Sequence, residues 1–364
     1  MYRKNRKNSE RKIIAIDFFC GCGGVTHDMK RARVDVIAGF DNDPNVKHAY
    51  EENNKGSVFY ELNINERKTN EQVIKNLLKN RIKDILIFSA CAPCQPFSLH
   101  NRKYKDDPRK VLMLKFIDLV EVLPKKIQPG VIFFENVGSM KKRGDEVLQK
   151  ALNRLKNMDY LILYPRIINS ADFGIPQNRR RLIFIAVQKN YLKNDKYFNW
   201  DYFYNKYSEK TITVRKAIGK LPPIPHGYRL NKKDPLHITR KLSPKNLERI
   251  KQITIDGGGR EMWDEKYNLE CYRNHSGHKD VYGRMHWNKP APTLTCKCIS
   301  LSNGRFGHPE QNRAISLREA AILQTLDDYK FKEPIFLDRV AKQIGNAVPP
   351  RLAMKFTKFI LELV

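Results

Sequence analysis

The sequence predicts an α/β fold, in which a doubly wound and mostly parallel sheet is followed by a second, smaller and irregular domain. Two observations support this prediction. Short apolar runs, typical of strands that are buried on both faces, alternate with helix-like stretches such as residues 71–80 and 111–123. Each run also ends at a polar or reactive residue, as expected where ligands bind at the carboxyl ends of parallel strands. The alternation stops after Val187.

The expected strands follow one another through the first half of the chain. They are the runs Ile13–Phe19, Val34–Phe40, Ile85–Phe88, Val131–Phe134 and Leu182–Val187. From residue 190 to 283 the chain is polar, aromatic and interrupted by proline and glycine, which indicates loops. We therefore expect a first domain over residues 1–189, a second over 190–307, and a helical return to the first domain over 308–364.

The composition is strongly basic. The 364 residues include 68 Lys and Arg against 39 Asp and Glu, a formal net charge of +29. Such a balance indicates a polyanionic partner, most often nucleic acid. A lysine-rich solvated surface is the alternative, because Lys and Asn are frequent along the whole chain. With 41% hydrophobic residues the chain can bury a core, which argues against general disorder.

Neither a membrane protein nor a secreted protein is expected. No run of about 18 apolar residues occurs. The basic start precedes an apolar stretch that Asp17 interrupts and that no small-residue cleavage site follows. We expect residues 1–11 to form a loose tail. Seven scattered cysteines, an odd number, fit a reducing compartment better than a disulfide framework. The expected location is the cytoplasm, without a membrane partner.

The first strand ends in a glycine-rich segment, Asp17-Phe18-Phe19-Cys20-Gly21-Cys22-Gly23-Gly24. Glycines after a strand allow a tight turn and let a ligand approach the backbone closely. Asp41, which follows the next strand, stands where an acid can bind a ribose diol. Taken alone, the pattern Gly-x-Gly-Gly would serve NAD, a flavin or S-adenosylmethionine, or only a structural turn.

The segment Cys91-Ala92-Pro93-Cys94 follows the third strand and allows two interpretations. A Cys-x-x-Cys pair can be a redox or zinc site. Zinc needs further ligands, however, and the other close cysteine pairs have an unusual one-residue spacing, so no metal is expected. The alternative is that Cys94 is a nucleophile, presented by a turn that Pro93 stiffens.

Two further segments carry groups that could assist such a nucleophile. Glu135 ends the apolar fourth strand, where a partly desolvated carboxyl group suits a proton donor, although acids at helix N-termini are also common. In Gln177-Asn178-Arg179-Arg180-Arg181, which enters the fifth strand, Arg179 and Arg181 would share one face of an extended chain. Two guanidinium groups on one face suit phosphate or carbonyl oxygens. A basic strand edge is the alternative.

Taken together and in this order, the segments resemble the C5-cytosine-specific DNA methyltransferases of prokaryotic restriction–modification type. That family carries Asp-Leu-Phe-x-Gly-x-Gly-Gly, an acid after the second strand, Pro-Cys-Gln-x-Phe-Ser, Glu-Asn-Val, Gln-x-Arg-x-Arg and a terminal Gly-Asn-Ala-Val. The matching segments here are Asp17–Gly24, Asp41, Pro93–Ser98, Glu135–Val137, Gln177–Arg181 and Gly345–Val348. The resemblance spans about residues 13–355, apart from much of 190–280.

The resemblance implies a class I S-adenosylmethionine-dependent methyltransferase fold, with a target-recognition domain over residues 190–307. It implies that Cys94 attacks C6 of a flipped-out cytosine while Glu135 protonates N3. Arg181 would bind O2 of the base, and Arg179 would hold a phosphate or the loop. The implied cofactor-binding residues are Asp17, Phe18, Gly21, Gly23, Asp41, Asn42, Asn63, Ile64, Pro93, Leu112, Asn346 and Val348.

The implied partners are double-stranded DNA and, in a functional sense, a cognate restriction endonuclease; we expect a monomer. Rival interpretations are an RNA cytosine methyltransferase, a non-catalytic DNA-binding protein with a degenerate fold, and a nucleotide-dependent oxidoreductase. The tRNA-modifying branch usually has Thr where Ser98 stands here. The sequence departs from the family at four places: Phe18 replaces Leu, Asp28 replaces a common Gly, Cys91-Ala92 replaces Gly-Pro, and Asn63 replaces an Asp expected to accept from the adenine amine.

Overall fold

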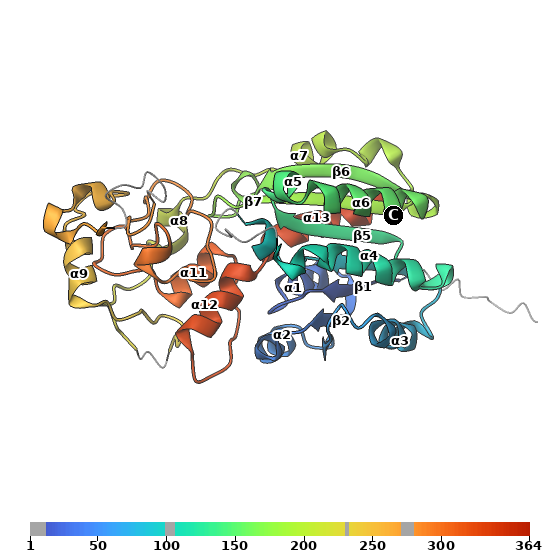
Figure 1. Ribbon diagram of the computed structural model, residues 1–364, viewed down its shortest axis with the longest axis horizontal. Helices are drawn as coiled ribbons and strands as arrows, with labels where there is room; N and C mark the ends of the chain where they lie inside the picture. The colour runs from blue at the N-terminus through green and yellow to red at the C-terminus, as the bar shows by residue number, and fades with distance from the viewer. Residues whose placement is uncertain (1–11, 99–105, 230–232, 271–279) are drawn as a thin grey trace, which may run out of the picture.

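The computed structural model describes residues 12–98, 106–229, 233–270 and 280–364. Figure 1 shows two lobes, one a sheet covered by helices on both faces, the other a smaller lobe of short helices and loops. The predicted basic tail, residues 1–11, lies outside the described residues. Within these ranges no helix combines the length and the apolar character that crossing a membrane requires.

The first lobe is built on one seven-stranded sheet with the order β3-β2-β1-β4-β5-β7-β6. Neighbouring strands are parallel, except that β7 runs antiparallel to both β5 and β6. The strands are β1 Ile13–Phe18, β2 Asp35–Asp41, β3 Val58–Glu61, β4 Ile85–Ala90, β5 Val131–Val137, β6 Tyr160–Asn169 and β7 Arg180–Gln188. This mostly parallel sheet confirms the predicted α/β fold; β3 and β6 were not predicted.

The strand order places the site. The chain passes from β1 to β2 on one side and later returns to β4 on the other side of β1, so the order reverses between β1 and β4. In doubly wound sheets, ligands bind in the crevice outside the carboxyl ends of the strands at such a point. The carboxyl ends of β1 and β4 lead directly into the glycine-rich segment and into the segment that contains Cys94.

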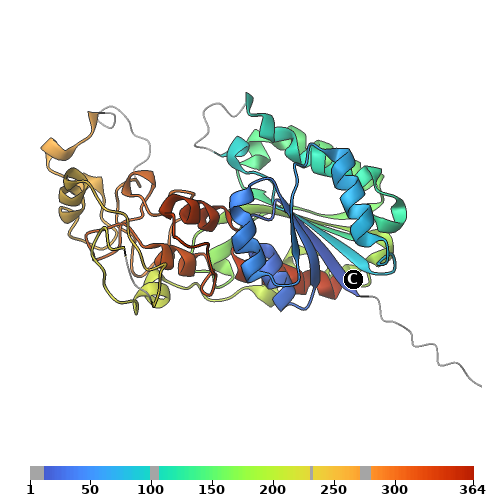
Figure 2. The same cartoon turned by 90° about the horizontal axis from the view of Figure 1, so that it is seen from below.

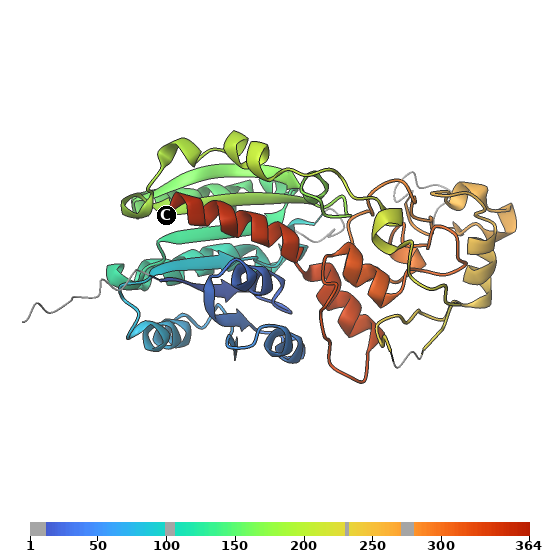
Figure 3. The same cartoon turned by 180° about the vertical axis from the view of Figure 1, so that it is seen from behind.

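Helices bury both faces of the sheet. Those on one face are α3 Arg67–Leu78, α4 Leu112–Val122 and α6 Asp145–Asn157; those on the other are α1 Gly24–Arg31, α7 Trp200–Tyr207 and α13 Pro350–Leu363. Figure 3 shows the C-terminal helix α13 lying across the back of the sheet. Helix α7 belongs to this core through Phe203 and Tyr207, although it lies beyond residue 190. The predicted domain limits themselves stay a prediction.

The second lobe has few regular elements, and its helices are short. They are α8 Val214–Ile218, α9 Pro244–Lys251, α11 Leu317–Leu323 and α12 Leu337–Asn346. Figure 2 shows the red helices of this lobe beside the blue helices of the first lobe. The contacts include a hydrogen bond from Asn53, at the end of α2 (Lys47–Asn53), to the Lys330 carbonyl (2.8 Å).

Buried arginines hold the loops of the second lobe together. Arg284 is 3% exposed and donates to several loop carbonyls, among them Ile253 (2.6 Å) and His308 (2.8 Å). Arg313 forms a fully buried pair with Glu319, with two contacts of 2.7 Å. Because loops lack the hydrogen-bond ladders of helices and sheets, guanidinium groups with five donors satisfy carbonyls that would otherwise be buried without partners.

Candidate active site

The glycine-rich segment makes a sharp turn directly after β1. Phe19, Gly21 and Gly23 all have positive φ, at 56°, 53° and 86°. A Cβ at Gly23 would lie 2.3 Å from Asn54 Nδ2 and 2.8 Å from the Tyr50 ring, so only glycine fits there. A Cβ at Gly21 would meet no atom within 4 Å. The backbone at Gly21 is therefore open to a ligand, whereas Gly23 lets the turn pack against α2.

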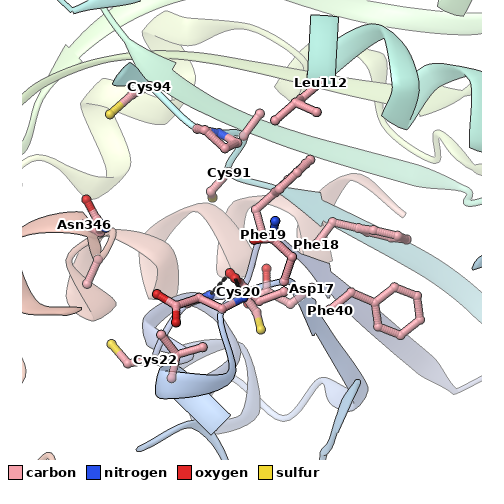
Figure 4. Close-up of a pocket in the computed structure, with 18 of the residues that line it drawn as sticks. Asp17, Phe18, Phe19, Cys20, Cys22, Phe40, Cys91, Cys94, Leu112 and Asn346 are labelled. Carbon is pink, nitrogen blue, oxygen red and sulfur yellow. Dashed lines mark hydrogen bonds between the residues drawn. The ribbon is translucent and has the colours of Figure 1, made fainter. Parts of the chain in front are cut away.

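A cavity of about 560 Å³ opens beside this turn, at the point where the strand order reverses. It is lined by every predicted catalytic and cofactor-binding residue except Gly23, which lies beneath the turn. Figure 4 shows side chains from the turn after β1, from the segment after β4 and from Asn346 around one space. A volume of this size is within the range of about 300–1,000 Å³ that small-molecule sites occupy.

Two carboxyl groups lie at the base of the cavity. Asp17 is buried and accepts a hydrogen bond from Thr26 Oγ1 (2.8 Å), while its Oδ1 makes no hydrogen bond of ordinary geometry within the described part of the chain. Burial raises the pKa of Asp17 to about 6. Asp41 accepts from the backbone N–H groups of Gly21 and Asp43, both at 2.9 Å, and burial raises its pKa as well.

Of the two aromatic residues at the turn, Phe18 packs in the core and Phe19 lines the cavity. Phe18 is 1% exposed, and its ring packs against Phe40, Phe88 and Phe116 at centroid distances of 4.8–5.1 Å. Phe19 is only partly buried and also lines the cavity, as labelled in Figure 4. Phe18 was predicted as a cofactor-binding residue, and Phe19 was not. The family motif already pointed to Phe19, because Phe19, and not Phe18, is aligned with the Phe of Asp-Leu-Phe.

On the opposite wall, Asn63 and Ile64 follow β3 and line the cavity with Leu112 of α4. Asn63 Oδ1 accepts hydrogen bonds from the backbone and the side chain of Asn65, both at 3.1 Å. The amide oxygen of Asn63 thus already stabilises its own turn, which an Asp would also do. Ile64 is 8% exposed and provides an apolar surface.

Cys94 lies at the start of a short 3₁₀ turn, and its thiol is half-buried. Asn136 Nδ2 donates to the Ala92 carbonyl (3.2 Å) and so fixes the segment before the thiol. Cys91 lines the same cavity, between Cys94 and the glycine-rich turn in Figure 4, and burial raises its pKa. The cysteines of the described ranges are all free. In the same ranges, no three His, Cys, Asp or Glu side chains gather where they could hold a metal ion.

Glu135 and Arg181 form an ion pair beside the cavity. Antiparallel pairing of β5 with β7 brings Arg181 opposite Val137, two residues from Glu135. Arg181 Nε lies 2.9 Å from Glu135 Oε1, and the side chains are only 10% and 7% exposed. An acid and a cation are thus held next to each other in a poorly solvated place, where their charges act strongly.

Arg179 and Arg181 are buried and Arg180 is exposed, as the alternation of an extended chain requires. Arg179 is 2% exposed and donates to the carbonyls of Leu294 (3.1 Å) and Gly345 (3.2 Å). Burial lowers the pKa of Arg179 to about 9, with Arg181 adding to the effect, so the group stays cationic at neutral pH. Its charge lies within electrostatic range of Cys94 and Glu135.

One face of α12 closes the cavity from the second lobe. Asn346 was predicted to lie there, whereas Arg339, Lys342 and Gln343 were not, although their spacing places all four on one helical face. Lys342 Nζ lies 2.8 Å from Asp43 Oδ2, and Gln343 Nε2 donates to the Asn45 carbonyl (3.1 Å). The cavity therefore has walls from both lobes.

The sequence was compared with known protein families and relatives. The model of the family described as C-5 cytosine-specific DNA methylase matches residues 13–362. A Type II methylase of Herpetosiphon aurantiacus, M.HgiDII, is 38% identical over 352 residues, covering 95% of this chain and 94% of the relative. The Type II methyltransferase M.Eco47II of Escherichia coli is 27% identical, covering 98% of this chain and 81% of the relative.

Solved structures show the same fold. A putative DNA modification methyltransferase encoded within an E. coli prophage superimposes with a TM-score of 0.71 at 23% identity, covering 97% of this chain and 99% of its own. The Entamoeba histolytica methyltransferase EhMeth gives a TM-score of 0.63 at 18% identity, with 97% and 99% coverage.

Proposed function

The chain belongs to the C-5 cytosine-specific DNA methylase family, and from this premise we propose that it methylates cytosine with S-adenosylmethionine in a specific sequence of duplex DNA. It is a DNA methyltransferase of the Type II restriction–modification kind. The proposal adds the methyl donor, a flipped-out base and a covalent bond through Cys94. The observation that carries it is the meeting of Cys94, Glu135 and Arg181 on one cavity at the reversal point of the sheet.

The residues of the cavity fit S-adenosylmethionine. The unpaired Oδ1 of Asp17, in a carboxyl group whose ionisation burial disfavours, would gain from a cationic partner such as the donor's ammonium group. Asp41 keeps lone pairs for ribose hydroxyls beyond its two backbone contacts. Phe19, Ile64 and Leu112 offer apolar surface for a purine ring. When bound, the group supplies a methyl carbon made electrophilic by its sulfonium.

The protein's own groups would then activate the base. Cytosine C5 is a poor nucleophile, so the thiolate of Cys94 adds to C6 while Glu135 gives a proton to N3. The electron pair displaced from the C5–C6 bond is then available at C5. Arg181, whose Nε lies 2.9 Å from Glu135, would bind O2 of the same ring. After methyl transfer, N3 returns its proton to Glu135, and loss of the C5 proton to solvent re-forms the C5–C6 double bond and expels the Cys94 thiolate. Glu135 must therefore carry a proton when the base binds.

The target carbon is inside the double helix, so this route requires that the nucleotide be turned out of the stack. The basic second lobe would contact phosphates and base edges beside the cavity. Phosphate contacts release counterions, so binding should weaken steeply with salt. Because Type II relatives come from restriction–modification systems, we further propose that the methylation protects DNA from an endonuclease of the same specificity.

Bisulfite sequencing of DNA from cells that express the protein tests the proposal. We expect protected cytosines at one recurring sequence, and none in cells that express Cys94→Ala. Incubation of the purified protein with 5-fluorodeoxycytidine duplexes and the methyl donor should give an irreversible complex. Transfer to tRNA but not to duplex DNA, or no complex with the fluorinated duplex, would overturn the proposal.

A further inference from the structure

The end of β5, which carries Glu135, and the residues up to Arg143 that follow it also hold the loop of Cys94. Side chains of this segment donate to three backbone carbonyls of the loop. The bonds are Asn136 to Ala92 (3.2 Å), Ser139 to Phe97 (2.7 Å) and Arg143 to Ser98 (2.6 Å). The thiol thus lies between carbonyls that are anchored to the segment that presents the acid.

Ser139 precedes α5 (Met140–Arg143), a position where a serine oxygen commonly accepts a hydrogen bond from the helix backbone. Here the side chain makes no capping bond, and its Oγ donates to the Phe97 carbonyl instead. The hydroxyl therefore anchors the Cys94 loop instead of capping its own helix. Arg143, at the other end of α5, donates a hydrogen bond to the next carbonyl of the loop, that of Ser98.

Gly144 completes this contact by making room for the Phe97 ring. A Cβ at Gly144 would lie 2.5 Å and 2.7 Å from two ring carbons, where ordinary contact begins at 3.4 Å. The backbone of Gly144, with φ −129° and ψ 19°, lies outside the left-handed region. Glycine is therefore needed at this position because a Cβ would overlap the Phe97 ring, and not because the backbone conformation requires it. Phe97 is 2% exposed, so its ring has little free space to move into.

We propose that Ser139, Arg143 and Gly144 are positioning residues that set the distance and orientation of Cys94 relative to Glu135. Two consecutive carbonyls and one buried ring fix both the place and the rotation of the loop's far end. Because the acid is fixed in β5, a shift of the loop's far end would change the relation between thiol and acid, while the cofactor walls formed by Gly21, Asp41 and Ile64 stay in place. This inference rests on the proposed function of Cys94 and Glu135.

Gly144→Ala and Gly138→Ala provide a matched test. The new Cβ at position 144 would overlap the Phe97 ring by about 0.9 Å, the difference between 3.4 and 2.5 Å. At position 138 the Cβ would touch Ile167 at an ordinary 3.4 Å. A displacement of about 1 Å at a reacting group costs on the order of 100-fold in rate. We expect such a loss of the single-turnover methylation rate in Gly144→Ala, with unchanged dissociation constants for DNA and S-adenosylmethionine, and a wild-type rate in Gly138→Ala.

Ser139→Ala and Ser139→Thr provide a second test that does not depend on how Gly144→Ala folds. The alanine should slow single turnover, and the threonine, which keeps the hydroxyl, should restore it. The inference would be overturned if the single-turnover rates of all these variants were equal. It would also be overturned if each loss of rate were matched by an equal loss of affinity for DNA or S-adenosylmethionine. Such a result is distinct from failure of the proposed function, in which the wild-type protein itself neither methylates DNA nor is trapped by the fluorinated duplex.

Discussion

Replacement of Glu135 by Gln separates the chemistry of the acid from its structural role. The amide keeps the shape of the side chain, but its N–H protons are too weakly acidic to be transferred to N3. Loss of a positioned general acid typically costs a factor of 10² to 10⁴, or about 2.7–5.4 kcal/mol of transition-state stabilisation. We expect the single-turnover rate of Glu135→Gln to fall by that factor.

The same substitution also removes the negative partner of Arg181. The ion pair has an Nε–Oε1 distance of 2.9 Å and side chains that are 10% and 7% exposed. Breaking a buried pair costs about 3–5 kcal/mol of stability. The partial negative charge of the Gln oxygen would still face Arg181 Nε, so the loss should lie at or below the lower end of that range. This loss changes the free energy of unfolding, whereas the missing proton changes the rate.

The assay is single-turnover transfer of a labelled methyl group to a DNA duplex, with urea unfolding measured in parallel. Glu146→Gln is the control, because Glu146 is exposed and forms an ion pair with Lys150 on the surface of α6. Such surface pairs contribute about 0–1 kcal/mol, and the rate should not change. A Glu135→Gln rate within threefold of wild type, in folded protein and with DNA bound, would refute the assignment of the acid.

Four other outcomes can be checked independently. Cys94→Ala should abolish methyl transfer and retain DNA binding in a gel-shift titration; any turnover contradicts the covalent route. Asp41→Ala should weaken cofactor binding about tenfold or more by calorimetry, because hydrogen bonds to a charged group contribute about 1.5–3 kcal/mol each. Glu319→Gln should leave the buried Arg313 charge unpaired and destabilise the protein by about 3–5 kcal/mol, measured by urea unfolding. For Asp17, burial raises the folded pKa to about 6 from 3.8. The folded protein therefore binds more protons than the unfolded chain between these values, so stability falls as pH rises through this window, by about 3 kcal/mol. In Asp17→Asn, the free energy of unfolding should no longer decrease as pH rises through this window. The same decrease in the variant as in the wild type would contradict the assignment to Asp17.

The sequence revealed the strands that are buried on both faces and missed those that are not. The five predicted runs form β1, β2, β4, β5 and β7. In β3 only Phe59 is buried, and four residues are too few to show a pattern. In β6, an edge strand, buried and exposed residues alternate irregularly, and the register with β7 shifts between Leu163 and Arg166 around Pro165. Continuous burial produces a continuous apolar run, and partial burial does not.

The site was predictable for a related reason. Parallel strands bring their carboxyl ends to one edge. Residues at or just beyond the ends of β1, β2, β4 and β5 could therefore be assigned to one cavity before the positions of their side chains were known. The wall formed by α12 lacked any such rule. Lys342 and Asp43 are 299 residues apart in the chain, and the sequence of α12 does not specify which surface of the first lobe it will meet.

For Arg179, the sequence pattern predicts on which face of the strand the side chain lies, but not which groups it contacts. Alternation along an extended chain determines the face on which its side chain lies, and the structure places it inward beside Arg181. The partner depends on segments distant in sequence, and both terminal nitrogens go to carbonyls, those of Leu294 and Gly345. Arg179 thus directs one N–H of each terminal nitrogen at the protein's own backbone. Its charge can still act on Cys94, whereas the salt dependence of DNA binding should arise from exposed lysines and arginines instead.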